Sequence, residues 1–531
     1  MFGYGNKDAT LLGYAFLLAL PIWYLTTYLL SPLRCYPGPF LAGWTNLWRM
    51  LQVRQGKYHV VVHELHKKYG AVVRIGPNVL DLDIPELIKT IYNIKSEYLK
   101  TEFYHGSSVK DNGTIIYNVF SECNPKSHAQ MKRPISKYYS LTGVLPLESH
   151  IDDMISYLCQ RLEENFIDPS NPTKTCELAE WIAYCKLKPC TSSFPGLIGC
   201  PDTWDVVGNA TFSKPIGYLE KGCDFDETLH IANVAMDYFS LVGQMPILDR
   251  LLDKNPIHRI GPPSFGTVAN ISVQHLIDRL QNKDTDCHDP NKPDFLDKFI
   301  EAKEKFPDVV DDTQIISYLL LNMVAGADTT SATINAALYM SLKHPQVWER
   351  LRTEVPAYDH TSGSTVVSYK SAKQFPYLDA VVRESMRCHP GVAMLLERYV
   401  PEGGLALPDG SLVPAGSIVG MNPYVVGRHT SVWGEDAEDF RPERWLRDET
   451  RETEDAFQER LLSMNKADLS FGGGSRSCIG KHFGLLEVYK VIATLVSRYD
   501  IKLAHPEKDW MTHNSFFMRQ TGIEVKLSRR R

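Results

Sequence analysis

The chain lacks the features that mark several large classes of protein. Its 57 Lys and Arg residues do not outnumber its 63 Asp and Glu residues, and a net charge of −6 argues against nucleic acid as the main partner. Cysteine is scarce, with 11 in 531 residues and no dense framework, so a disulfide-stapled secreted fold is not expected. Internal repeats, low-complexity tracts and long polar linkers are missing too. With 44% hydrophobic and 23% charged residues, the chain is globular and not disordered, collagenous or coiled-coil.

Charge is also absent from the stretch 9–33, which lies between Asp8 and Arg34. A helix needs about 20 apolar residues to cross a bilayer, so residues 1–33 are predicted to form an N-terminal membrane anchor. A cleaved signal peptide and a buried core helix are the alternatives, and the first would have a shorter apolar run that ends in a small-residue cleavage site. Basic residues follow the anchor, and the positive-inside rule then places the rest of the chain in the cytosol.

The remaining residues, 34–531, are predicted to form one large domain. Most of its segments have helical periodicity, and the longest helix is expected over 312–343, where Pro345 ends it. Short stretches with the composition of β-strands are 71–75, 79–82, 417–421 and 523–527. The fold class expected is therefore mainly α with small β-sheets.

One stretch interrupts a predicted helix. Residues 177–184 and 203–212 both have helical patterns, and the 18 residues between them, 185–202, contain three prolines and two glycines. A surface-loop insertion and translated non-coding sequence are equally good interpretations of this atypical insertion. Its three cysteines, Cys185, Cys190 and Cys200, have no CxxC pair and are a weak indication of zinc.

A glycine-rich loop with one cysteine carries the strongest chemical signal. The loop FGGGSRSCIG runs from Phe471 to Gly480, and Cys478 precedes an apolar helix. Glycines let a backbone approach a flat cofactor, and N–H groups at a helix start stabilise a thiolate, which can bind haem iron. The alternative is a buried cysteine in a turn. The loop resembles the haem-binding signature of the cytochrome P-450 superfamily, which implies the cytochrome P-450 fold, haem b as cofactor, Phe471 and Gly480 as cofactor-binding positions and Cys478 as the axial iron ligand.

Two further matches to this family follow its order along the chain. Glu384 and Arg387 form a Glu-x-x-Arg pair, and residues three apart on a helix lie on one face and can form an ion pair, although an isolated pair of this kind is uninformative. Arg444 lies in the segment FRPERW, which is similar to the family's Pro-Glu-Arg segment. The resemblance implies that the three residues form a structural network beside the haem loop and take no part in the chemistry.

The middle of the longest predicted helix contains AGADTT, residues 325–330, which resembles the family's oxygen-activation motif. The resemblance implies that Gly326 leaves room for dioxygen, that Thr329 donates to it and that Asp328 relays protons from solvent, so that Asp328 and Thr329 are the catalytic residues. An exposed polar turn is the alternative, but apolar residues flank the motif on both sides and indicate burial.

Haem propionates need cationic partners, and the resemblance implies four. Arg476 lies two residues before the cysteine, Arg398 lies in ERYVPEG, and His128 and Lys132 occupy the family's His-x-x-x-Arg positions. Lysine supplies charge without the bidentate fork of arginine. A basic surface that docks a partner protein is the competing interpretation of His128 and Lys132.

The resemblance covers residues 36–527, and it is strongest to filamentous-fungal microsomal members of the pisatin-demethylase-like type. It implies a monooxygenase in the endoplasmic reticulum membrane, single-pass with a cytosolic catalytic domain. Electrons would come from NADPH through a cytochrome P-450 reductase, with cytochrome b5 as a second candidate donor. The resemblance also implies substrate contacts from 101–120, 322–325, 391–396 and 514–517.

The apolar residues in these segments predict a hydrophobic small-molecule substrate, and the family type predicts a role in fungal secondary-metabolite biosynthesis. Two other functions compete. One is a haem-thiolate isomerase or dehydratase that acts on a peroxide, which the intact Asp328-Thr329 pair disfavours. The other is a non-enzymatic haem-binding membrane protein, but nothing in the sequence resembles an accompanying signalling module.

Overall fold

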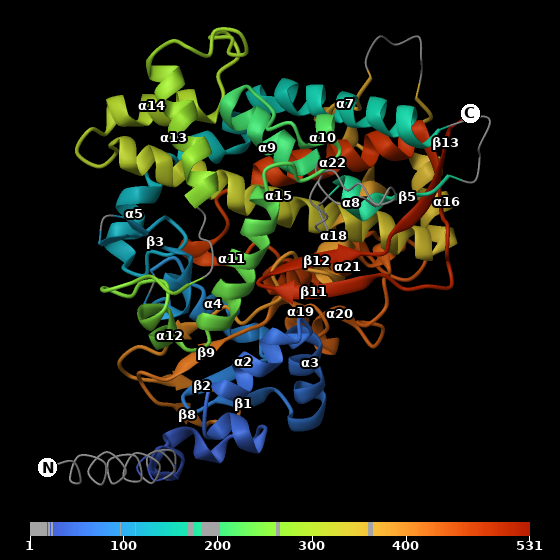
Figure 1. The fold of residues 1–531 in the computed structure, drawn as a ribbon. Helices are drawn as coiled ribbons and strands as arrows, with labels where there is room; N and C mark the ends of the chain where they lie inside the picture. The colour runs from blue at the N-terminus through green and yellow to red at the C-terminus, as the bar shows by residue number, and fades with distance from the viewer. Residues whose placement is uncertain are drawn as a thin grey trace, which may run out of the picture.

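The computed structural model describes residues 19, 22, 25–95, 97–111, 113–167, 174–182, 202–261, 266–358 and 365–530. Helices dominate these residues, and Figure 1 shows them above a smaller part that contains strands β1, β2 and β9. This is the mainly α fold with small sheets that the sequence predicts. The predicted insertion at 185–202 lies outside the described residues except for Asp202, so it stays a prediction.

The longest of the described helices is α15 (Asp312–Lys343), which runs through the middle of the helical part (Figure 1). Its bounds are those expected from the sequence, because the Asp311 side chain accepts a hydrogen bond from the backbone N–H of Gln314 at its start and Pro345 follows its end. The other α-helices are α2 (Leu47–Arg54), α3 (Tyr58–Tyr69), α4 (Ile88–Ile91), α5 (Pro125–Lys132), α6 (Leu141–Val144), α7 (Glu148–Phe166), α8 (Leu178–Ile182), α9 (Asp202–Phe212), α10 (Tyr218–Lys221), α11 (Thr228–Val242), α12 (Pro246–Leu251), α13 (Gly266–Leu280), α14 (Phe295–Lys305), α16 (Pro345–Glu354), α17 (Tyr369–Ala372), α18 (Pro376–Cys388), α19 (Pro423–Val426), α20 (Thr430–Trp433), α21 (Glu454–Ala467) and α22 (Lys481–Arg498).

Short 3₁₀ helices connect several of these elements. They are η1 (Pro32–Cys35), η2 (Phe40–Gly43), η3 (Pro85–Leu87), η4 (Glu102–Ser107), η5 (Ser136–Tyr139), η6 (Leu145–Leu147), η7 (Pro442–Trp445) and η8 (Gly474–Arg476).

The strands form small, separate sheets. A four-stranded sheet has the order β1-β2-β9-β6, in which β2 and β9 pair in parallel and the other neighbours are antiparallel. A three-stranded sheet has the order β10-β13-β5, and β3–β4, β7–β8 and β11–β12 are two-stranded. The strand bounds are β1 (Val72–Gly76), β2 (Val79–Leu82), β3 (Val109–Asp111), β4 (Thr114–Ile116), β5 (Cys176–Glu177), β6 (Arg398–Tyr399), β7 (Leu405–Ala406), β8 (Leu412–Val413), β9 (Ile418–Gly420), β10 (Tyr499–Leu503), β11 (Met511–Ser515), β12 (Phe517–Thr521) and β13 (Glu524–Arg529).

Four helices and one strand pack closely against α15 and fix its position. They are α9, α13, α18, α22 and β12. The glycine-rich loop with the cysteine lies between α21 and α22, so the start of α22 brings that loop to α15. Because α15 and α22 are mostly buried, the fold holds the cysteine loop against the helix that carries AGADTT.

The predicted anchor, residues 1–33, falls mostly outside the described residues, although residues 25–30 are helical. Within the part of the chain that the structure describes, no helix is both long and apolar enough to cross a bilayer.

Candidate functional site

The glycine-rich loop is folded by two glycines in the left-handed region. Gly472 has φ +66 and Gly474 has φ +63, a conformation that residues with a side chain rarely adopt. A Cβ on Gly474 would also lie only 2.4 Å from the carbonyl oxygen of Tyr92. The loop is closed by the backbone N–H of Cys478, which donates to the carbonyl of Phe471 at 2.9 Å. These contacts hold the cysteine in a fixed place before α22.

The Cys478 side chain opens onto an internal cavity although it lies deep in the protein. Burial raises the pKa of the Cys478 thiol, whereas the backbone N–H groups of Gly480 and Lys481 and the ammonium groups of Lys132 and Lys481 lower it. The N–H groups at the start of α22 and the nearby cations thus favour the thiolate, which is the form that binds metal.

The cavity beside Cys478 has a volume of about 310 Å³ and is lined by residues from distant parts of the chain. One face of α15 forms a wall, and the rest of the lining includes residues from α5, α9, α11, α22, the β11–β12 turn and the cysteine loop. Most of the wall is apolar, as a site for a hydrophobic molecule requires. Apolar lining residues include Val119, Phe120, Ile135, Val207, Met236, Phe295, Leu320, Leu321, Val324, Ala325, Val392, Leu396, Phe483, Phe516 and Phe517.

A cluster of basic side chains lines the same cavity. Lys132 donates to the carbonyls of Ser475 and Ser477 at 3.1 and 3.2 Å. The other three are Arg398, Arg476 and Lys100, whose hydrogen bonds also go to carbonyl or hydroxyl oxygens. Among the described residues, none of the four forms an ion pair with a carboxylate, so the cluster has positive charge to offer to a bound anion.

Burial and mutual repulsion disfavour the protonated, charged forms of these basic side chains. Burial, followed by the charge of Arg398, holds the pKa of Lys100 well below its usual value. Burial also lowers the pKa of His128 to about 3, with Arg476, Lys132 and Lys100 contributing, so His128 is neutral at pH 7 in this structure. A negative group nearby would raise each of these pKa values, so the cluster favours binding of an anion.

These residues fit haem. Cys478 supplies a thiolate for the iron, Gly472 and Gly474 bring the loop close to a flat ring, and Phe471 and Gly480 line the cavity beside it. The unpaired basic side chains suit two carboxylates at one edge of the cofactor. Haem would thus be held by Cys478 and by Lys100, His128, Lys132, Arg398 and Arg476.

Only some of the polar side chains of the AGADTT motif line this cavity. Thr329 lines the cavity, and its hydroxyl donates to the carbonyl of Ala325 at 2.8 Å. Asp328 does not line the cavity, and its carboxylate accepts a hydrogen bond from the indole N–H of Trp204 at 3.1 Å. A Cβ on Gly326 would lie 3.1 Å from Val207, so this glycine also allows α9 to pack closely against α15.

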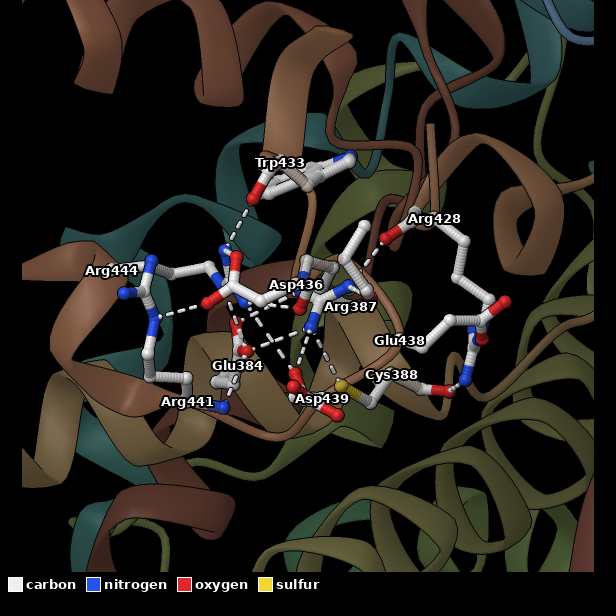
Figure 2. Close-up of polar contacts among 12 residues, drawn as sticks. Glu384, Arg387, Cys388, Arg428, Trp433, Asp436, Glu438, Asp439, Arg441 and Arg444 are labelled. Atoms are coloured by element: carbon white, nitrogen blue, oxygen red, sulfur yellow. Dashed lines mark hydrogen bonds and ion pairs between the residues drawn. The ribbon is translucent and has the colours of Figure 1, made fainter. Parts of the chain in front are cut away.

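The Glu-x-x-Arg pair and the Pro-Glu-Arg arginine meet in one polar cluster (Figure 2), and none of the three residues lines the cavity. Glu384 lies 2.7 Å from Arg387 and 2.8 Å from Arg444, and all three are buried. Arg387 also donates to the carbonyls of Gly427 and Ala437, both at 2.6 Å. The arrangement ties α18 to the segment 427–444, which precedes α21, and places no charged group in the cavity.

The structure brings together most of the residues that the resemblance names. Tyr104, Val119 and Phe120 of the segment 101–120 line the cavity, as do residues from the other three predicted substrate segments. The middle of 391–396 does not reach it. Its apolar residues Ala393, Met394 and Leu395 are core.

Sequence reasoning missed several residues of the cavity wall. Lys100 directly precedes a predicted segment, and its place among the aromatic residues of YLKTEFY was its only signal. Val207 and Thr211 of α9 also line the cavity, and only the phase of that helix could have indicated them.

Comparison with known proteins gives a consistent result. A family model described as Cytochrome P450 matches residues 37–196 and 200–527. The chain is 46% identical over 514 residues to cytochrome P450 monooxygenase cfoH of Aspergillus candidus, covering 97% of this chain and 91% of that protein. It is 34% identical over 496 residues to a cytochrome P450 monooxygenase of Aspergillus terreus (91% and 94% covered) and 34% identical over 495 residues to cytochrome P450 monooxygenase cicH of Emericella nidulans (93% of each).

Proposed function

Because the chain belongs to the cytochrome P450 family and is a monooxygenase-type oxidoreductase, we propose that it inserts one oxygen atom from dioxygen into a hydrophobic small molecule, with electrons from NADPH. The observation that carries this proposal is the single cavity shared by Cys478, Thr329 and a largely apolar wall. Bound haem supplies the iron that activates dioxygen. A cytochrome P-450 reductase delivers the electrons, and cytochrome b5 is a second candidate donor.

In this proposal each group of residues has a separate role. Cys478 holds the iron as a thiolate, and the basic cluster holds the carboxylates of the haem. Thr329 lies on the cavity wall and can pass its hydroxyl proton into the cavity, while Asp328, the preceding residue on α15, supplies protons to it. Glu384, Arg387 and Arg444 hold α18 against η7. The apolar wall excludes water and orients the substrate.

The substrate class follows from the cavity wall. Phe120, Phe516 and Phe517 supply aromatic surface, and the polar side chains of Ser107 and Asn118 lie at the same wall. A fungal secondary metabolite with a mainly apolar skeleton suits this surface. The pisatin-demethylase-like subtype stays a prediction.

We also place the protein at the endoplasmic reticulum membrane, with the catalytic domain in the cytosol. The uncharged stretch 9–33 supports this, with exposed Leu29 and Leu30 at its end, and so do the exposed apolar side chains of Phe40 and Leu41 just beyond it. The full chain should remain in the microsomal pellet after an alkaline carbonate wash. Recovery of the full chain in the soluble fraction would contradict the placement.

The function is tested with microsomes that contain the full chain and its reductase. Hydrophobic compounds are screened for a change of iron spin state, and those that bind are incubated with NADPH. The expected product carries one added oxygen, labelled when ¹⁸O₂ is used. The monooxygenase proposal fails if NADPH gives no labelled product with any compound that binds, or if a hydroperoxide is converted without NADPH.

A further inference from the structure

The helix α9 packs along the part of α15 that carries AGADTT. Trp204, Val207 and Thr211 are spaced three and four residues apart, so they lie on one face of α9. Val207 lies against Gly326, Thr211 lines the cavity and Trp204 bonds Asp328. This face therefore contacts the oxygen-activation motif at Gly326 and at Asp328.

Trp204 is one of the most deeply buried large side chains, with 1% of its surface exposed. Its indole nitrogen can only donate, and it donates to Asp328 Oδ1 at 3.1 Å. A carboxylate deep in a protein needs such a donor, because burial without one strongly disfavours the charged form. Thr329, one residue further along α15, faces the cavity instead.

The charged group that acts on Asp328 comes from β12, and its own partners come from α11 and β11. Arg519 of β12 acts on Asp328 through its charge, but its guanidinium forms an ion pair with Asp237 of α11. His513 of β11 lies 3.5 Å from the same Asp237 oxygen. Asp237 and His513 are nearly half exposed, so the partners of Arg519 reach solvent. Among the described residues, Trp204 donates the hydrogen bond that the Asp328 side chain accepts.

We propose that Trp204 is a positioning residue for Asp328, and that its indole N–H holds the carboxylate on the α9 side of α15 and so controls when Asp328 can pass a proton to Thr329. The inference rests on the proposed function, in which this pair supplies protons. In the step, the Thr329 hydroxyl leaves the Ala325 carbonyl and gives its proton to a basic atom of the reactant bound in the cavity, while protonated Asp328 gives its proton to Thr329 Oγ1. Asp328 becomes a carboxylate again and accepts the hydrogen bond from the Trp204 indole N–H once more.

The direct test compares wild type, Trp204→Phe, Asp328→Asn and the double variant in reductase-coupled turnover. Loss of the N–H should raise the peroxide released per NADPH about fivefold, the size expected for one hydrogen bond. The double variant should release no more than Asp328→Asn alone, because Trp204 acts through Asp328. The matched control is Trp181→Phe, another buried tryptophan, whose ring packs edge-on against Phe166 at 5.3 Å. It should behave as wild type.

A second readout does not depend on turnover. The infrared band of the Asp328 carboxyl in the haem-bound protein is assigned by its loss in Asp328→Asn and then titrated with pH. In Trp204→Phe the pKa of Asp328 should rise by about one unit, since the donor that favours the charged form is gone. The control Trp181→Phe should leave the titration unchanged. If Trp204→Phe takes up no haem, β-(3-benzothienyl)alanine at position 204 keeps the ring shape without the N–H.

The outcomes separate this inference from the proposed function. An unchanged titration in the variant without the N–H overturns the positioning role, and so do additive effects of Trp204→Phe and Asp328→Asn on peroxide release. If wild type forms no product from NADPH, the proposed function fails, and the infrared titration still decides whether Trp204 holds Asp328.

Discussion

Arg444 Nε lies 2.8 Å from Glu384 Oε1 and joins two parts of the chain 60 positions apart. The same carboxylate accepts hydrogen bonds from Arg387 and from the indole N–H of Trp445, and Figure 2 shows the arginines arranged around it. Glu384 has no exposed surface. These bonds hold the pKa of Glu384 below its usual value despite its burial. These bonds therefore hold the Glu384 carboxylate in one position, where it joins the two parts of the chain.

Arg444→Gln should destabilise the protein by about 3 kcal/mol and reduce haem content, because it removes one of the two cations that compensate a buried carboxylate. The matched control is Arg441→Gln, since the Arg441 side chain is nearly half exposed and pairs with Asp436 at the surface. It should change stability by less than about 1 kcal/mol. Urea unfolding midpoints and haem content measure both. Equal losses for the two variants would contradict the role given to Arg444.

Lys100→Met should weaken haem retention by about tenfold, because it removes one cation from the cluster that would face the haem carboxylates. The ammonium group lies 3.8 Å from the ring of Tyr104 and within 2.5 Å of the Phe120 carbonyl, so its position is fixed. Transfer of haem to apomyoglobin gives the rate. Lys126→Met, at an exposed position at the start of α5, is the control. If both variants lose haem at the wild-type rate, Lys100 does not hold the cofactor.

Phe516 has φ +78 at the turn between β11 and β12, a conformation that is strained for a bulky residue. Phe516→Gly should be more stable than Phe516→Ala by about 1 kcal/mol, because both lose the ring and only glycine relieves the backbone. The order should reverse at Phe517, which lies in β12, where glycine is unfavourable. Thermal unfolding of the four variants measures this. Alanine variants that are the more stable at both positions would contradict the strain at Phe516.

The cysteines should differ sharply in reactivity at pH 8. Burial raises the pKa of Cys388 to about 11, so its thiol stays protonated and is a poor nucleophile. Cys35 is exposed. Iodoacetamide followed by peptide mass spectrometry should find Cys35 modified in the native protein and Cys388 modified only after unfolding. Rapid modification of Cys388 in the folded protein would contradict its burial.

Local signals explain why parts of the fold were predictable. Asp311 and Pro345 mark the ends of α15, and the expected bounds 312–343 are those observed. The β11–β12 hairpin was not predicted, because Phe516 and not a glycine occupies its left-handed turn position. Residues 511–521 also lack the alternation of a half-buried strand.

The site residues likewise differ in whether the sequence could predict them. Cys478 and Thr329 belong to motifs that are continuous in the sequence, so a single chain was enough to name them. The Trp204–Asp328 hydrogen bond joins positions 124 apart, and neither residue carries a local signal of the other. Lys100 joins the basic cluster only through the pairing of its backbone with Arg398. Contacts of this kind arise from tertiary packing, which periodicity and spacing do not encode.

The most direct test of the haem-thiolate site is the reduced carbon monoxide difference spectrum of the full chain in microsomes, recorded beside Cys478→Ser. Wild type should give the Soret band at the position typical of thiolate-ligated haem. Cys478→Ser should lose that band, because a serine hydroxyl supplies no thiolate. A wild-type spectrum with only the blue-shifted band, or an unchanged band in Cys478→Ser, would contradict Cys478 as the iron ligand.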